Sequence, residues 1–170
     1  MLFRSVKGLL HTDEVNHAAG TISNATSRGY NLIQGNNLTV TRVRPKTEVV
    51  RESHSVSEAM EDLRRLGEER LGKADLDSGL EYGTIAISKY RRTDGTNSWL
   101  VTIPGTDGQP DSPFGWPQNV ELMSSHSKQR MEADSARMVQ EALKQAGIKS
   151  DEPVALIGHS QGGIVAATIA

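Results

Sequence analysis

The sequence contains no cysteine among its 170 residues. Disulfide scaffolds, thiolate zinc sites, iron–sulfur clusters and cysteine nucleophiles are therefore excluded for this chain. Aromatic residues are also scarce, at 4% of the chain, so its core has to rely on Val, Ile, Leu and Ala.

A large excess of charge is missing as well. The chain has 19 Lys and Arg against 21 Asp and Glu, a formal net charge of −2. This balance argues against a nucleic-acid binder held by bulk positive charge. No apolar run reaches the roughly 18 residues of a transmembrane helix, and no apolar h-region follows Met1, so neither a transmembrane segment nor a signal peptide is predicted. Localisation stays open, with the cytoplasm as the default, and the sequence leaves the oligomeric state unknown.

Alternating helix and strand patterns begin after about residue 50. Four apolar residues in a row, Val154 to Ile157, predict a fully buried central strand, which the long crossover from the preceding strand makes parallel. The connection between the two earlier strands contains Asp94-Gly95, which is typical of a hairpin turn. We expect helices from Ser55, over Lys128 to Ala146 and over Gly163 to Ala170; strands over Thr84 to Tyr90, Ser98 to Ile103 and Val154 to Ile157; and a loop from Asp107 to Val120.

The most informative segment, residues 158–162, reads G-H-S-Q-G and fits the pattern G-x-S-x-G. It lies between a predicted strand and a predicted helix, which is the context that this motif requires. A sharp turn there strains the serine and lifts its hydroxyl clear of the sheet, so Ser160 is the predicted nucleophile. Gly158, Gly162 and Gly163 allow backbone segments to approach closely, and His159 flanks the nucleophile. A glycine-rich turn with a passive serine is the alternative.

Two segments are predicted to form an oxyanion hole. The backbone N–H of Gln161 begins the helix after the turn, where the helix dipole adds positive potential. The second donor is expected from the loop after an earlier strand, where Pro104, Gly105 and Thr106 follow Ile103. Gly105 lets the backbone approach a ligand, and Thr106 offers its N–H and its hydroxyl. A simple turn initiated by Pro104 remains the alternative.

These segments resemble the α/β-hydrolase superfamily, and in particular its bacterial lipase- or esterase-like members. The resemblance rests on Trp99 through Thr106 and Leu156 through Gly163, with a weaker likeness over Trp116 to Met123, and it covers roughly Glu81 to Ala170. It implies an α/β architecture, a partial α/β-hydrolase fold with a mostly parallel central sheet and flanking helices. We accordingly expect residues 51–170 to form the N-terminal part of this domain, and residues 1–50 to be an extension of uncertain structure.

The resemblance also implies a serine hydrolase that cleaves a small carboxylic ester or lipid through an acyl-enzyme on Ser160, with no metal or cofactor. In this family the acid and the histidine follow the serine. None of the ten residues after Ser160 is Asp, Glu or His. We therefore expect the acid and the histidine beyond residue 170, in a larger hydrolase, and an inactive chain without them. His126 and His159 are weaker candidates for the base.

Two other functions remain open at this point. An acyltransferase or a thioesterase of the same fold uses the same nucleophile turn. The other is a non-catalytic, hydrolase-like binding module, which contains the same nucleophile turn but catalyses no reaction.

Overall fold

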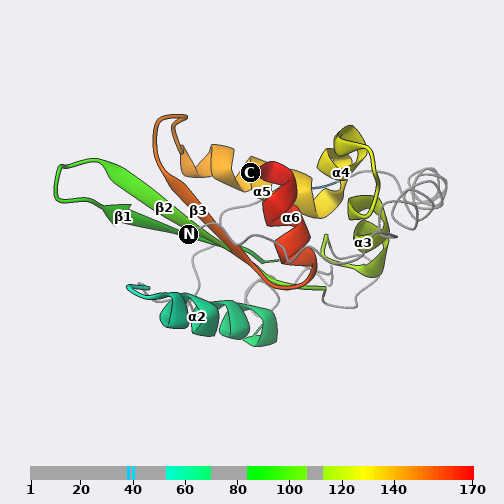
Figure 1. The fold of residues 1–170 in the computed structure, drawn as a ribbon, viewed down its shortest axis with the longest axis horizontal. Helices are drawn as coiled ribbons and strands as arrows, with labels where there is room; N and C mark the ends of the chain where they lie inside the picture. The colour runs from blue at the N-terminus through cyan, green and yellow to red at the C-terminus, as the bar shows by residue number, and fades with distance from the viewer. Residues whose placement is uncertain (1–37, 39, 41–52, 70–83, 107–112) are drawn as a thin grey trace, which may run out of the picture.

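A computed structural model describes residues 38, 40, 53–69, 84–106 and 113–170 (Figure 1). They form a small mixed sheet with helices, so the architecture is of the α/β kind. The elements in chain order are α2 (Val56–Glu69), β1 (Ala86–Arg91), β2 (Asn97–Ile103), α3 (Trp116–Leu122), α4 (Ser127–Glu132), α5 (Asp134–Ala146), β3 (Val154–Gly158) and α6 (Gln161–Ile169).

Strands β1 and β2 form the predicted hairpin. They pair antiparallel, with Tyr90 opposite Ser98. In the turn, the carboxylate of Asp94 accepts the backbone N–H of Thr96 at 2.9 Å. Gly95 follows with a φ of 83°, a left-handed conformation that glycine adopts without steric cost. The hairpin expected from Asp94-Gly95 is thus confirmed.

Strand β3 pairs with β2 in the predicted parallel direction, with Leu156 beside Val101. The described sheet has the order β1-β2-β3 and contains one antiparallel and one parallel pairing, so it is mixed rather than mostly parallel. The prediction of a fully buried β3 is wrong, because Val154 and Ala155 are exposed. The reason is positional: β3 is an edge strand of the described sheet, and an edge strand has a neighbour on one side only.

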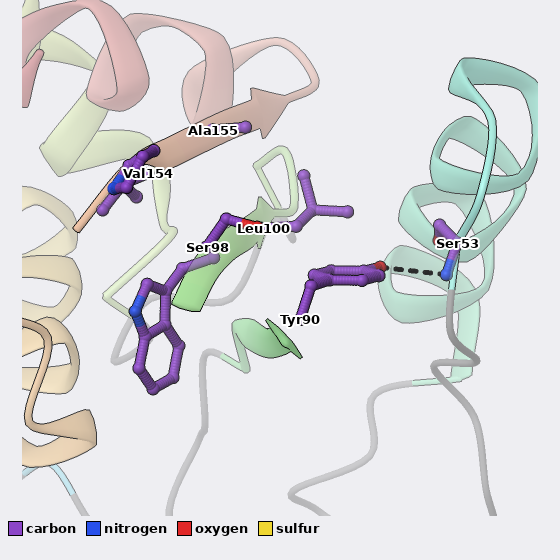
Figure 2. A pocket seen from close by; sticks show the side chains of 8 residues that line it. Ser53, Tyr90, Ser98, Leu100, Val154 and Ala155 are labelled. Carbon is purple, nitrogen blue, oxygen red and sulfur yellow. Dashed lines mark hydrogen bonds between the residues drawn. The ribbon is translucent and has the colours of Figure 1, made fainter. Parts of the chain in front are cut away.

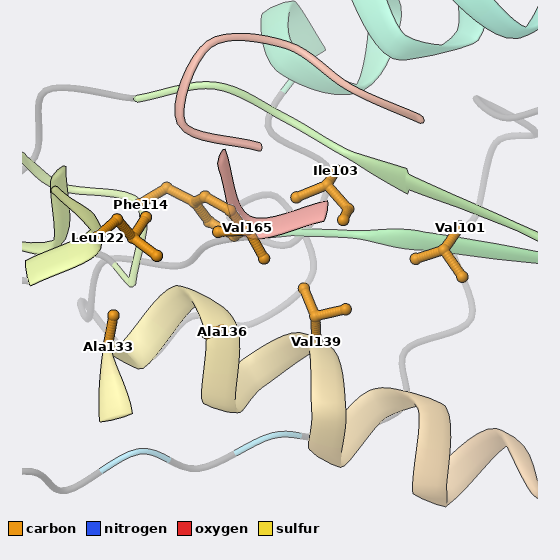
Figure 3. Packing of buried hydrophobic residues seen from close by; sticks show 8 residues of the cluster. All are labelled: Val101, Ile103, Phe114, Leu122, Ala133, Ala136, Val139 and Val165. Atoms are coloured by element: carbon orange, nitrogen blue, oxygen red, sulfur yellow. The ribbon is translucent and has the colours of Figure 1, made fainter. Parts of the chain in front are cut away.

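The main hydrophobic core lies on one face of the sheet (Figure 3). Val101 and Ile103 alternate along β2 and point to the same side, as the period of a strand requires. There they meet side chains from α5 and α6, and all members of the cluster are at most 2% exposed. The cluster consists of Val101, Ile103, Phe114, Leu122, Ala133, Ala136, Val139 and Val165.

The opposite face of the sheet is covered by α2 (Figure 1). Ala59, Leu63 and Leu66 recur at helical spacing and are buried. At the start of this helix, the hydroxyl of Ser55 accepts the backbone N–H of Glu58 at 3.2 Å. The sheet therefore lies between helices on both faces, with α5 and α6 on the side of the main core.

Two predictions about the helical segments are wrong. The loop expected over Asp107 to Val120 contains the start of α3, where Pro117 occupies the first turn and so loses no hydrogen bond. The single helix expected over Lys128 to Ala146 is two helices, α4 and α5. They separate at Ala133, whose ψ of 137° is extended and whose side chain is fully buried in the core.

None of the helices in the described ranges is long and apolar enough to cross a membrane. The predicted extension over residues 1–50 lies outside the described residues, except for Leu38 and Val40.

Candidate functional site

The chain turns sharply between β3 and α6, and Ser160 is at the centre of the turn. Its φ is 50° and its ψ is −118°, and it is the one non-glycine residue with positive φ in the described ranges. Such a conformation costs on the order of 1–3 kcal/mol for a residue with a Cβ, and it persists only where the surroundings enforce it. Ser160 is exposed. The geometry therefore presents a serine hydroxyl to solvent at the start of a helix.

Close backbone contacts enforce this turn. A Cβ on Gly158 would lie 2.3 Å from the carbonyl carbon of Gly162, and a Cβ on Gly162 would lie 2.2 Å from the carbonyl oxygen of Ile103. Both distances are far below a van der Waals contact. Gly163 is different, since its nearest neighbour would be the Gly158 oxygen at 3.5 Å, an ordinary contact. Two of the three glycines are thus required by the way β2, β3 and α6 meet.

The first turn of α6 leaves one N–H group available at the serine. The N–H groups of Gly162 and Gly163 donate to the carbonyls of His159 and Ser160, both at 2.9 Å. The N–H of Gln161 donates to no backbone carbonyl of the described residues. It is one of the free donors with which every helix begins, at the positive end of the helix dipole. An anion bound beside the Ser160 hydroxyl would accept a hydrogen bond from this N–H group.

The structure brings Gly105 next to the serine. A Cβ on Gly105 would lie 3.3 Å from the Cβ of Ser160 and 2.8 Å from Nδ1 of His159. The loop after β2 is held there because the His159 N–H donates to the Ile103 carbonyl at 3.3 Å. Thr106, the next residue in the chain, is half-buried. The two segments predicted to form the oxyanion hole therefore lie side by side.

The region before α3 also contacts the turn. The side chain of Gln161 is fully buried, and its Nε2 donates to the carbonyl of Gly115 at 3.3 Å. The side chain of Asn119, within α3, donates from Nδ2 to the hydroxyl of Thr106 at 2.6 Å. No role of Asn119 is predicted from the sequence, because nothing in its local pattern distinguishes it from a surface amide.

Within the described ranges, no histidine or acidic side chain is bonded to Ser160. The Ser160 hydroxyl makes no hydrogen bond with another side chain of residues 53–69, 84–106 or 113–170. His159 lies against the Gly105 loop, and His126 is an exposed residue at the start of α4. In the same ranges no group of three or more His, Asp or Glu side chains is arranged to hold a metal ion.

A hollow of about 350 Å³ lies elsewhere, between the sheet and the segment before α2 (Figure 2). Tyr90 and Leu100 line it, and the Tyr90 hydroxyl accepts the Ser53 N–H at 3.0 Å. None of the predicted site residues belongs to its lining. The hollow is therefore separate from the turn at Ser160.

Comparisons of the chain with protein-family models, with curated proteins and with solved structures gave no match. The resemblance described above therefore rests on the motif residues alone.

Proposed function

We propose that Ser160 is the nucleophile of a serine hydrolase that acts on a carboxylic ester or lipid. The single observation that carries the proposal is the backbone conformation of this residue, a strained non-glycine turn between a strand and a helix. This turn exposes the hydroxyl beside the free N–H of Gln161 and the Gly105–Thr106 loop. Main-chain donors in that position stabilise the negative charge that develops on a carbonyl oxygen during acyl transfer.

In the proposed reaction, the Ser160 oxygen attacks the carbonyl carbon of the ester. The hydroxyl proton passes to a base, and the carbonyl oxygen becomes an oxyanion that accepts hydrogen bonds from Gln161 and from Gly105 or Thr106. Collapse of this intermediate releases the alcohol and leaves the acyl group on Ser160, from which water removes it. In this mechanism the base is a histidine oriented by an acid, and we assign neither role to a described residue, because no histidine or carboxylate of residues 53–69, 84–106 or 113–170 bonds to the Ser160 hydroxyl.

The test is covalent labelling of Ser160 by a fluorophosphonate ester, followed by intact-mass and peptide-mass measurement. Imidazole in the buffer stands in for the histidine side chain, so we expect labelling to accelerate as imidazole is added. Ser160→Ala abolishes the adduct, whereas Ser150→Ala, which removes another exposed serine, leaves it unchanged. Labelling that survives in Ser160→Ala at the wild-type rate contradicts the proposal.

Without added imidazole, we expect negligible turnover of a short activated ester by the 170-residue chain, because an unpaired serine hydroxyl is a weak nucleophile. Release of nitrophenol from p-nitrophenyl acetate measures this. Robust turnover that disappears in Ser160→Ala would show that the chain already supplies a base, and would contradict the expected absence of one at Ser160.

A hydrolase-like binding module without turnover is the second candidate. The observation that favours it is that the Ser160 hydroxyl lacks a side-chain partner among the described residues. This candidate predicts no adduct at Ser160 at any imidazole concentration.

A further inference from the structure

The hydrogen bond between α3 and the loop after β2 has a direction that bears on the proposed site. Asn119 is the donor, through Nδ2, and the Thr106 hydroxyl oxygen is the acceptor, at 2.6 Å. A hydroxyl has one proton and two lone pairs. Because Asn119 occupies a lone pair of Oγ1, the proton of Thr106 remains available for a second partner.

From this geometry we infer that Asn119 is a positioning residue, which orients the Thr106 hydroxyl so that it donates to the oxyanion formed at Ser160. The inference rests on the proposed function and deepens it, since it adds a side-chain donor to the main-chain donors. Thr106 directly follows Gly105, whose Cβ position is 3.3 Å from the Cβ of Ser160, so the hydroxyl belongs to the loop that borders the nucleophile.

The same segment of chain also contacts the other side of the proposed oxyanion hole. Gly115, which precedes α3, accepts a hydrogen bond from the side chain of Gln161, whose N–H is the other donor. Gly115 and Asn119 are thus bonded to Gln161 and Thr106, which belong to the two segments of the proposed oxyanion hole. The start of α3 therefore sets the spacing between the two donors.

Because Asn119 is the donor of this hydrogen bond, a substitution that leaves only an acceptor at position 119 tests its role. In Asn119→Asp the side chain keeps its size, but its carboxylate only accepts hydrogen bonds. It draws the Thr106 proton toward α3 and away from the oxyanion. In Asn119→Ala the hydroxyl is no longer restrained, and in Thr106→Val it is absent while the shape of the side chain is nearly kept.

The experiment measures the maximal rate and the half-saturating concentration of fluorophosphonate labelling at Ser160, at fixed imidazole, for each variant. Loss of one oxyanion donor costs about 10²- to 10³-fold in rate, so Thr106→Val should approach that loss. We expect Asn119→Asp to approach it too, with an unchanged half-saturating concentration. Thr106→Ser, which keeps the hydroxyl, should retain most of the rate.

A double-mutant cycle separates positioning from general support of the fold. If Asn119 acts through the Thr106 hydroxyl, adding Asn119→Asp to Thr106→Val lowers the rate no further. The matched control is Asn97→Ala, which removes an amide that donates to Glu152, also at 2.6 Å, at the far end of β2. This control should leave the labelling rate unchanged, and circular dichroism verifies that each variant is folded.

Each outcome decides the inference. Labelling of Ser160 at the wild-type rate in Asn119→Asp, or losses that multiply in the double variant, overturn the role of Asn119 and leave the proposed function standing. Absence of any Ser160 adduct in the wild-type chain with imidazole overturns the proposed function, and the role of Asn119 with it.

Discussion

At the scale of single residues, the turn at Ser160 depends on missing side chains. The backbone of α6 passes so close to β2 that a Cβ on Gly162 would collide with the carbonyl oxygen of Ile103. The first turn of α6 therefore lies in direct backbone contact with the end of β2. Ser160, the residue before α6, adopts a strained conformation that allows this contact. The positive φ of Ser160 is therefore a consequence of packing between backbones rather than a preference of serine itself.

Substitutions at two neighbouring glycines test whether close backbone packing holds this turn. Gly162→Ala should lower the free energy of unfolding by roughly 1–3 kcal/mol, the usual cost of overpacking, because the added methyl meets backbone that cannot move aside. Gly163→Ala should be neutral or raise it by about 0.5–1 kcal/mol, since its Cβ finds ordinary contacts and alanine favours a helix. Urea unfolding measures both. Equal effects of the two substitutions would contradict the account.

At the scale of elements, Glu152 joins the start of β3 to the start of β2. Its carboxylate accepts the side-chain amide of Asn97 at 2.6 Å, the indole N–H of Trp99 at 2.7 Å and the backbone N–H of Lys149 at 3.2 Å. The Asn97 amide, followed by the Lys149 N–H and the indole of Trp99, holds the pKa of Glu152 below its usual value near 4.5. One ionised side chain in the connection between α5 and β3 thus bonds to two residues at the start of β2 and to the backbone of that same connection.

The depressed pKa of Glu152 predicts a pH dependence of stability. A carboxyl group with a lower pKa in the folded state stabilises the fold above its unfolded pKa, and this contribution is lost as the pH falls through the folded pKa. We expect Glu152→Gln to be less stable than wild type at pH 7, and the difference to shrink as the pH falls below about 4.5.

Thermal unfolding between pH 7 and pH 3 measures this difference. Asp151→Asn is the matched control, because it removes an exposed negative charge next to Glu152 without removing these hydrogen bonds. A gap between Glu152→Gln and wild type that persists unchanged to pH 3 would show that ionisation is not involved.

At the scale of the whole molecule, the face of the sheet that carries the candidate site is packed by one apolar cluster. It gathers residues from β2, α5 and α6, together with Phe114 and Leu122 from the segment before and within α3 (Figure 3). The same cluster supports the site, because it holds α6 against the strand that leads into the Gly105 loop. Substitutions that weaken this cluster are therefore expected to lower the stability of the fold and to disturb the geometry around Ser160 together.

Two aromatic residues that are two positions apart test the extent of this cluster. Phe114 is 1% exposed, whereas Trp116 is 68% exposed. Phe114→Ala should lower the free energy of unfolding by about 3–5 kcal/mol, through lost burial and a cavity. Trp116→Ala should change it by no more than about 0.5 kcal/mol, although it removes a larger ring. Urea unfolding compares them, and similar losses would mean that Trp116 is covered in solution.

Local patterns predicted several elements because their causes are local. Asp94-Gly95 supports a hairpin through its own side chain and its own φ, and Gly147 ends α5 with a φ of 72° for the same kind of reason. Nothing comparable marks Ala133, where α4 and α5 separate, since alanine favours a continuous helix. The hydrogen bond from Asn119 to Thr106 was not predicted, because the two residues are 13 positions apart and meet only after folding.

By itself, the sequence determined the hairpin, the parallel strand and the segment in which Ser160 follows that strand, because turn residues and short apolar runs act within a few positions of themselves. Only the tertiary structure decided that the Gly105 loop lies against His159 and Ser160, that Val154 and Ala155 are exposed and that Asn119 bonds to Thr106. These features depend on which backbones approach one another. That is settled by the packing of β2, β3, α3 and α6 as a unit, and not by any single segment.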